Sequence, residues 1–265
     1  MNTDLNYKEI NRKSWNNKVD THMSSEFYDI KGFLSGKSSL NPIELGLLGN
    51  FKGKSILHLQ CHFGKDSISL SREGAQTTGV DLSDKAIRKA KELAKKCKVD
   101  TTFICSDIFD LPHHLDREFD IVFASYGTIG WLPDLKRWAE IIARYMKPEG
   151  RFVFAEFHPV LWMFDDDFDA IKFGYFNTGA IEENIDGTYA DTTAAINQDY
   201  IMWNHSLEDI ISSLLNQKLR LDLFEEYNYS PYDCFQGTVE IEPGKFQIKK
   251  MGDKLPMVFA LQVSK

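Results

Sequence analysis

The sequence has little cysteine and no excess of basic charge. Its four cysteines, Cys61, Cys97, Cys105 and Cys234, have no paired spacing, so free thiols in a reducing compartment are the simplest interpretation. The formal net charge is −8. This acidic balance disfavours a nucleic-acid or anionic-membrane partner, because phosphate recognition depends on clustered cations.

Long apolar runs and targeting signals are also missing. No apolar run approaches the roughly 18 residues of a membrane span. Residues 1–6 lack a basic stretch followed by an apolar core, which disfavours a signal peptide. We therefore expect a cytoplasmic protein with no membrane partner. With 43% hydrophobic residues over 265 positions, the chain can form one large α/β domain, or one domain with a sizeable insertion.

What the sequence does contain is an alternation of strand and helix patterns after residue 41. Strand-like apolar runs lie at 55–59, 77–80, 101–105, 119–124 and 151–157. Helical patterns lie at 42–48, 66–73, 83–97 and 135–145. Strands that lack polar alternation are typical of a parallel sheet with helices on both faces. The pattern predicts a doubly wound α/β sheet with right-handed crossovers.

The segments on either side of this region differ from it. Residues 5–20 are polar with spaced apolar positions and predict a surface helix. We expect residues 1–40 to form a helical segment that acts as a lid or simply packs against the domain. Residues 159–204 are rich in aromatic and acidic residues, and a structureless loop of that length is unusual, so we expect hairpins that fold over the sheet's edge. A helix at 206–216 and strands at 220–227 and 257–263 complete the pattern.

Candidate functional residues follow the predicted strands. In a doubly wound sheet, ligands bind at the carboxyl ends of the strands. Five such ends can be located, and we expect them to meet in one cleft. They are residues 58–64, 81–82, 106–108, 125–127 and 156–158.

Two carboxylates stand at these ends. Asp81 can accept hydrogen bonds from both hydroxyls of a ribose, or it belongs to the start of the helix that follows. Asp107 can accept a hydrogen bond from an adenine amino group, or it forms a turn before Ile108. The two acids together favour an adenosine-type ligand more strongly than either does alone.

The turn after the first strand departs from the usual nucleotide-binding pattern. Gln60 and His62 occupy positions where such turns usually carry glycine. Gly64, where the helix begins, still lets a ligand approach the backbone amides. Asp66 lies in the first helical turn and would repel a pyrophosphate. The turn therefore disfavours a dinucleotide.

These segments resemble the motifs of class I S-adenosylmethionine-dependent methyltransferases of the small-molecule type. The resemblance covers roughly residues 41–157, with a weaker similarity from residue 206 to the end. The first motif is divergent, since His58 replaces the family's usual acid and Gln60 and His62 replace its glycines. The matching segments are residues 56–64, 79–83, 106–108, 119–122 and 146–150.

The resemblance implies a Rossmann-like, seven-stranded sheet that is mostly parallel, with an antiparallel last strand and an insertion after strand five. It implies a methyltransferase domain at residues 41–265, in which residues 159–204 form an aromatic-rich substrate cap. It also implies S-adenosylmethionine as the cofactor and S-adenosylhomocysteine as the product.

The resemblance further assigns cofactor-binding residues at the first four strand ends. They are Gln60, Cys61, His62, Gly64, Asp81, Leu82, Asp107, Ile108 and Ser125. The residues of the first turn would surround the methionine part, and Asp81 would bind the ribose hydroxyls. Leu82 would pack on the adenine, whose amino group Asp107 would meet. Ser125 would bind the methionine amine through backbone groups.

Histidines and aromatics supply the remaining candidates. His58, Cys61 and His62 need not face one point and have no evident fourth ligand, so no metal is predicted. His158 directly follows strand five and is either a base that faces the substrate or a structural residue. Tyr126 is a second catalytic candidate, in an aromatic wall that would suit a cationic sulfonium.

The expected function is methyl transfer to a small-molecule acceptor by in-line displacement, in a monomer or homodimer. Residues 125–128 lack the Asn/Asp/Ser-Pro-Pro-Tyr/Phe motif of nucleic-acid methyltransferases that modify exocyclic amines. Two alternatives stay open. A catalytically silent S-adenosylmethionine-binding or regulatory protein would account for Gln60 and His62. An NAD-dependent oxidoreductase fits Asp81 but not Asp66.

Overall fold

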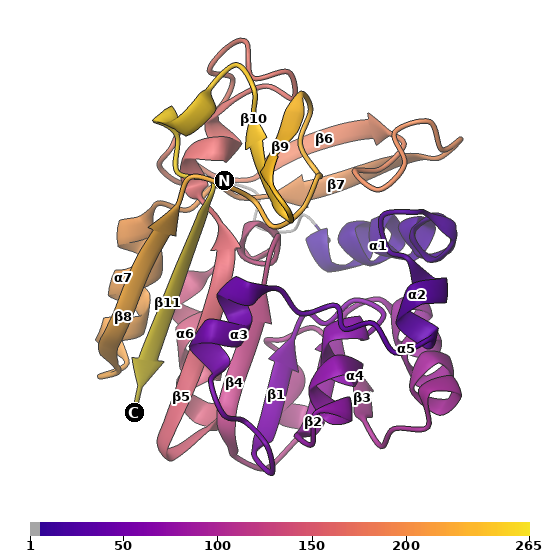
Figure 1. Ribbon diagram of the computed structural model, residues 1–265. Coiled ribbons are helices and arrows are strands. Elements are labelled where there is room, and N and C mark those ends of the chain that lie inside the picture. The colour runs from indigo at the N-terminus through magenta and orange to yellow at the C-terminus, as the bar shows by residue number, and fades with distance from the viewer. Residues whose placement is uncertain (1–5) are drawn as a thin grey trace.

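The computed structural model describes residues 6–265, which surround one central sheet (Figure 1). The sheet has seven strands in the order β3-β2-β1-β4-β5-β11-β8. They are β1 (Ser55–Leu59), β2 (Gln76–Asp81), β3 (Thr102–Cys105), β4 (Phe119–Ser125), β5 (Met146–Phe157), β8 (Arg220–Tyr227) and β11 (Val258–Ser264). Strands β1 to β5 are parallel, whereas β11 is antiparallel to both β5 and β8. The predicted mostly parallel sheet with an antiparallel last strand is confirmed.

Helices cover both faces of this sheet. On one face lie α3 (Pro42–Leu48), α4 (Lys65–Arg72) and α5 (Asp84–Cys97), and on the other lie α6 (Leu135–Tyr145) and α7 (Leu207–Asn216). Neighbouring side chains of β1 point to opposite faces of the sheet. Ile56 packs in the hydrophobic cluster with α3, and Leu57 packs in the cluster with α6 and α7. All five residues of β1 are therefore buried, which explains why its sequence shows no polar alternation.

Local signals in the sequence set the ends of several helices. The Ser83 side chain accepts a hydrogen bond from the Ala86 backbone amide and so caps the start of α5. Helix α3 begins with Pro42 and a capping box between Asn41 and Glu44. The predicted bounds of β1, α6 and β8 match the observed ones.

The start of β5 differs from the prediction. The strand begins at Met146, five residues before the predicted start, and therefore includes Pro148 and Gly150. The ladder between β4 and β5 shifts register between Phe119 and Ile121, which leaves residues 147–150 of β5 outside the regular pairing. A proline is tolerated at such a position because it need not donate to the ladder.

Several elements lie outside the central sheet, above the ends of its strands (Figure 1). Helices α1 (Tyr7–Ser24) and α2 (Ile30–Leu34) precede it in the chain. The hairpin of β6 (Ile181–Asp186) and β7 (Asn197–Met202) lies in the segment for which we expected hairpins. A second hairpin, β9 (Thr238–Glu242) with β10 (Lys245–Ile248), was not predicted. Four short 3-10 helices are η1 (Leu111–His113), η2 (Ile129–Trp131), η3 (Pro159–Met163) and η4 (Gly252–Lys254).

Helix α1 is not the surface helix that its sequence predicts. Leu5, where the predicted helix starts, lies outside the described residues. The inward face of α1 buries mainly polar side chains, among them Asn11, Lys18 and His22. The Asn11 amide accepts a hydrogen bond from the Ile201 backbone N–H (2.9 Å) and donates one to its carbonyl (2.8 Å), which ties α1 to β7. A helix whose buried face is polar cannot be recognised from apolar periodicity.

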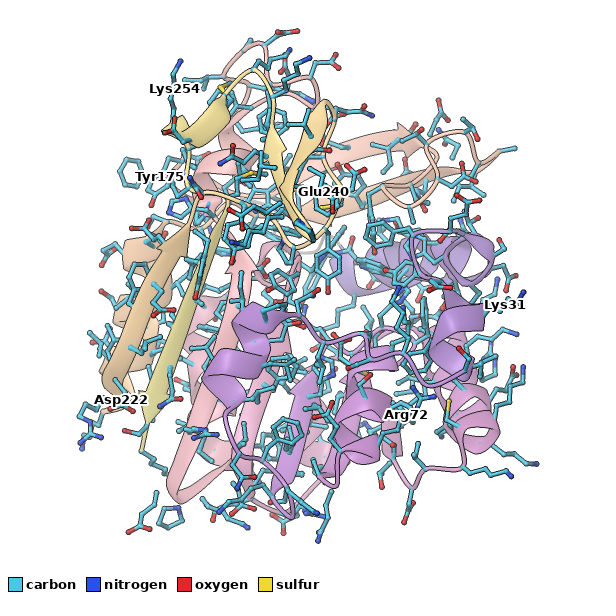
Figure 2. The ribbon with its side chains drawn as sticks, viewed as in Figure 1. Lys31, Arg72, Tyr175, Asp222, Glu240 and Lys254 are labelled. Carbon is cyan, nitrogen blue, oxygen red and sulfur yellow. The ribbon has the colours of Figure 1, made fainter. Side chains whose placement is uncertain are left out.

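The outer surface carries charged side chains in the usual way. Lys31, Asp222, Glu240 and Lys254 are exposed and point outward (Figure 2). The four cysteines are free. Within residues 6–265, no helix combines the length and apolar character that a membrane span requires.

Candidate active site

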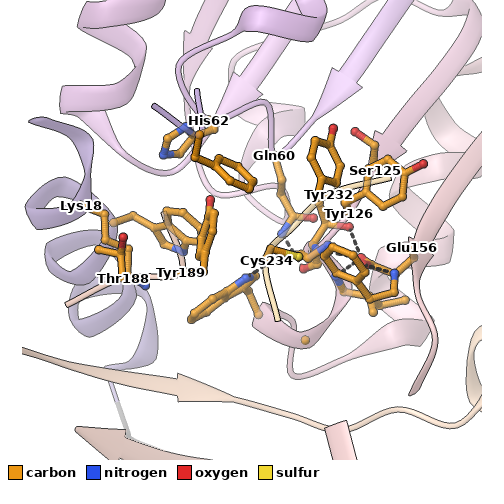
Figure 3. Close-up of a pocket in the computed structure, with 18 of the residues that line it drawn as sticks. Lys18, Gln60, His62, Ser125, Tyr126, Glu156, Thr188, Tyr189, Tyr232 and Cys234 are labelled. Carbon is orange, nitrogen blue, oxygen red and sulfur yellow. Dashed lines mark hydrogen bonds between the residues drawn. The ribbon is translucent and has the colours of Figure 1, made fainter. Parts of the chain in front are cut away.

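A cavity of about 930 Å³ lies over the carboxyl ends of the parallel strands (Figure 3). We call the strand ends that line it the floor: residues 58–64, 81–82, 106–108, 125–127 and 156–157. We call the elements opposite them the roof: α1, residues 129–132 with η2, the β6–β7 hairpin and residues 231–236. The five predicted strand ends do meet in one cleft, although His158 does not line it.

The turn after β1 takes an unusual backbone path. Gln60, His62 and Gly64 have φ values of 54°, 51° and 75°, in the left-handed region that favours glycine. A side chain is impossible at residue 64 without movement, because a Cβ there would lie 2.5 Å from the Phe103 ring. Gln60 offsets part of its strain by donating its side-chain amide to the Thr128 carbonyl at 2.8 Å. The non-glycine residues therefore keep the turn shape that glycines usually provide.

Asp81 is held by the turn and by the start of α5. One carboxylate oxygen accepts from the His62 backbone amide at 2.7 Å, and the other accepts from the Ser83 amide at 2.8 Å. Burial raises the pKa of Asp81 to about 6. Since Ser83 is the cap of α5, Asp81 is free of that role, and each of its oxygens retains capacity for a further donor.

Asp107 lies just past the end of β3 and is held by a local turn. It lines the cavity, and its carboxylate accepts from the Phe109 amide at 2.9 Å, which forms the expected turn. Lys8 of α1 lies 3.2 Å from Asp107 and 2.7 Å from Asp110. Leu82 and Ile108 also line the cavity.

The far side of the floor contains Asp66 and Ser125. The Ser125 hydroxyl donates to the Asp66 carboxylate at 3.5 Å. Burial raises the pKa of Asp66. This carboxylate therefore faces the end of β4, where a cation or amine would be favoured and a phosphate repelled.

Glu156 has a structural role that the sequence did not reveal. It is 1% exposed, and its carboxylate accepts from the Thr128 amide (2.7 Å), the Thr128 hydroxyl (2.9 Å) and the Ile129 amide (3.1 Å). The Gly127 and Phe157 amides also donate to it, and Figure 3 shows the network. The sequence signal that could have revealed this role is a lone glutamate at the end of an apolar strand. Glu156 fixes the loop after β4, and with it the edge of the cavity.

His158 does not line the cavity and has the structural one of the two roles that the sequence left open. Its Nε2 lies 2.9 Å from Glu226 of β8, and its Nδ1 accepts from the Val160 amide. The contact with Val160 caps the start of η3. Burial lowers the pKa of His158 despite the neighbouring Glu226. Its function in the structure is to hold the chain where it leaves β5.

Tyr126, the second catalytic candidate, does line the cavity. Its backbone has a φ of 38°, and its hydroxyl donates to Glu44 of α3 at 2.8 Å. Glu44 is fully buried, and burial raises its pKa to about 7. Asn41 donates both to this carboxylate and to the hydroxyl of Tyr232, another cavity residue. Sequence reasoning missed Glu44, because a glutamate in a short helix gives no functional signal.

The two histidines considered as metal ligands contact different partners. The His58 Nδ1 lies 2.8 Å from the Ser67 hydroxyl of α4. The His62 Nε2 lies 3.3 Å from the Nδ1 of His22 on α1. Between residues 6 and 265, no cluster of three or more His, Cys, Asp or Glu side chains has metal-binding geometry.

Sequence comparison places this site in a known domain. A family model described as a methyltransferase domain matches residues 56–150, from β1 into β5. The chain is 28% identical over 137 residues to the ubiquinone biosynthesis O-methyltransferase of Idiomarina loihiensis. That match covers 50% of this chain and 56% of the relative, so the chain spans about half the length of the curated relative it matches.

Solved structures extend the similarity to the whole fold. An S-adenosylmethionine dependent methyltransferase from Mesorhizobium loti has a TM-score of 0.58 and 19% identity, over 88% of this chain and 100% of that one. The magnesium protoporphyrin IX methyltransferase from Synechocystis PCC 6803, solved with bound S-adenosylmethionine, has a TM-score of 0.52 and 14% identity over 100% of both chains. The family model identifies residues 56–150 as a methyltransferase domain, and the strand order and the solved structures agree with its Rossmann-like fold.

Proposed function

We propose that the protein transfers a methyl group from S-adenosylmethionine to a small-molecule acceptor by in-line displacement. The observation that carries this proposal is the Asp81 carboxylate, held by two backbone amides at the floor of the cavity inside a methyltransferase domain. Its remaining acceptor capacity matches the two hydroxyls of a ribose.

The rest of the floor fits the same cofactor. The residues of the first turn, 60–64, would surround its methionine part, and Leu82 would pack on the adenine. Asp107 would accept from the adenine amino group beside Ile108, and Ser125 would meet the methionine amine. The acids of the floor suit these cationic and N–H-bearing groups. Asp66 disfavours the pyrophosphate of NAD, which weighs against an oxidoreductase.

The protein itself would contribute to the reaction by aligning the acceptor with the methyl group and by excluding water. The cofactor, when bound, would supply an electrophilic methyl group on a sulfonium sulfur. Glu156 fixes the loop after β4, and the roof covers the space in front of the floor. Positioning of this kind can be worth about 7–11 kcal/mol in favourable cases.

Tyr126 and Glu44 would serve an acceptor that carries a proton at neutral pH. In that case the acceptor's proton would pass to the Tyr126 oxygen while the Tyr126 proton passes to the Glu44 carboxylate. The hydrogen bond between the two side chains and the pKa of Glu44, about 7, suit this transfer.

A small acceptor is favoured by the shape and charge of the molecule. The roof encloses the floor with a helix and hairpins, which leaves a cavity of small-molecule size. The net charge of −8 disfavours a polyanionic acceptor such as a nucleic acid. The acceptor named for the Idiomarina relative belongs to that protein and serves here only as a candidate for assay.

Isothermal titration calorimetry with S-adenosylmethionine, S-adenosylhomocysteine and NAD⁺ tests the proposal. We expect saturable binding of the first two and none of NAD⁺. Saturable binding of NAD⁺ alone would overturn it. Turnover is then measured as S-adenosylhomocysteine release with a panel of small phenols, amines and carboxylates. Tight cofactor binding without turnover on any of them would favour the regulatory alternative.

A further inference from the structure

One charged side chain in the cavity has no charged or hydrogen-bonding partner. Lys18 of α1 is 3% exposed and lines the cavity, where Figure 3 shows it beside the aromatic residues of the roof. Among residues 6–265 its ammonium group makes no hydrogen bond and no ion pair. Burial is the one cause that lowers its pKa, to about 8, so no neighbouring carboxylate stabilises the charge.

Three aromatic rings surround this ammonium group. Lys18 Nζ lies 4.5 Å from the ring centroid of Trp15, 5.2 Å from that of Trp131 and 5.7 Å from that of Tyr200. These rings come from α1, η2 and β7, so three separate parts of the roof converge on one cation. Trp131 meets Trp15 edge to face at 5.2 Å and Tyr200 at 5.6 Å. The cage holds the cation by cation–π attraction and leaves it without an anion.

Three acids near the cavity are already engaged with other partners, and none of the described acids forms an ion pair with Lys18. Asp81 accepts from two backbone amides, and Asp107 pairs with Lys8. Glu183, which accepts from the Tyr200 hydroxyl at 2.6 Å, also pairs with Lys172. The protein thus supplies a fixed, desolvated cation and no counter-charge for it. A ligand with an anionic group would complete the arrangement.

The other cavity-lining lysines do not share this condition. Lys37 pairs with Asp29 at 3.2 Å, and Lys65 donates to the Tyr28 carbonyl. Lys18 therefore differs from them in having an aromatic cage in place of an oxygen partner. This difference points to a ligand-binding role and not to a role in holding the fold.

We propose that Lys18 binds an anionic group of the methyl acceptor, and that the acceptor is therefore a small acid whose carboxylate meets Lys18 Nζ between Trp15 and Trp131. The inference rests on the proposed function and deepens it, because it names the class of acceptor. Aromatic walls on both sides favour a planar acid, such as an aromatic carboxylate.

The test uses the whole chain loaded with saturating S-adenosylhomocysteine. A panel of aromatic and aliphatic carboxylates is titrated against their neutral carboxamides, in the wild type, Lys18→Met and Lys18→Arg. We expect at least one acid to bind tenfold or more tighter than its amide, about 1.4 kcal/mol. Lys18→Met should abolish that preference and change the affinity for S-adenosylhomocysteine less than twofold. Lys18→Arg should keep the preference.

Stability and a matched control separate binding from folding. Removing an unpaired buried charge should raise the melting temperature of Lys18→Met, whereas loss of a fold-holding lysine would lower it. Lys13→Met, with a side chain 70% exposed on the same helix, should change nothing.

Three results would overturn the proposal. In the first, no acid in the panel is preferred over its amide. In the second, the preference persists in Lys18→Met. In the third, Lys18→Met weakens S-adenosylhomocysteine binding tenfold or more, about 1.4 kcal/mol, which would assign Lys18 to the carboxylate of the cofactor. A wild type that does not bind S-adenosylhomocysteine at all would instead refute the proposed function.

Discussion

The floor and the roof of the cavity are built on different principles. Backbone amides hold two acids of the floor: two amides bind Asp81, and four amides with one hydroxyl bind Glu156. The roof is held mainly by side chains, such as Asn11 on β7 and the aromatic cage of Lys18. Backbone contacts tolerate changes in sequence, whereas side-chain contacts depend on particular residues. The floor can therefore keep one cofactor chemistry while the roof adapts to one acceptor.

The largest expected effect is the loss of cofactor affinity on substitution of an acid of the floor. Asp81→Ala removes the acceptor for both ribose hydroxyls and leaves two backbone amides without their carboxylate. Hydrogen bonds to a charged group contribute about 1.5–3 kcal/mol each, so cofactor affinity should fall about a hundredfold or more. Titration calorimetry with S-adenosylhomocysteine measures this loss.

Asp116→Ala is the matched control for that substitution. The Asp116 side chain is fully exposed and does not line the cavity, so its loss should leave the affinity unchanged. Unchanged affinity in Asp81→Ala would refute the assignment of the floor as the cofactor site.

The next effect concerns the roof. Asn11→Ala leaves the buried N–H and carbonyl of Ile201 unpaired, which should lower the free energy of unfolding by about 2 kcal/mol. Urea denaturation measures the change. Cofactor affinity should fall only slightly, because the floor is intact. Asn17→Ala, an exposed change on the same helix, should be neutral. Equal losses in both variants would show that the contact between α1 and β7 contributes nothing particular.

A smaller effect on cofactor affinity is expected from a change in pH. Ribose hydroxyls donate to the ionised form of Asp81, so cofactor binding favours loss of its proton. With a pKa of about 6 in the free protein, affinity should be constant above pH 7 and fall below 6. The decrease approaches tenfold per pH unit below that pKa. Calorimetry from pH 5 to 8 measures it, and a profile that stays unchanged in Asp81→Asn would assign the titration to another group.

The smallest effects should come from the divergent turn. Gln60→Gly loses the bond to the Thr128 carbonyl but relieves a left-handed backbone, and each contributes about 1 kcal/mol with opposite sign. In His62→Gly the hydrogen bond to Asp81 is kept, because the backbone makes it. Unfolding free energy and cofactor affinity should both change little. A tenfold loss of affinity, about 1.4 kcal/mol, would mean that these side chains have taken over the work of the missing acid.

The floor was predictable from sequence because its signals are local. A buried parallel strand shows a continuous apolar run, and the polar residue that follows it lies at the ligand-binding edge. This logic located Asp81, Asp107 and Ser125 without a structure. It did not decide between the two roles of His158, because a residue that follows a strand can face the cavity or contact another part of the sheet, as His158 contacts Glu226 of β8.

The sequence by itself determined the sheet, its crossovers and the order in which the floor acids follow the strands, since these depend on apolar runs and turn residues close together in the chain. Only the tertiary structure decided the roof. Helix α1 buries a polar face because β7, nearly two hundred residues later, offers partners for Asn11. Lys18 meets Trp131 and Tyr200 for the same reason. Contacts between such distant segments leave no periodic signal, so the proposed acceptor chemistry became visible only in three dimensions.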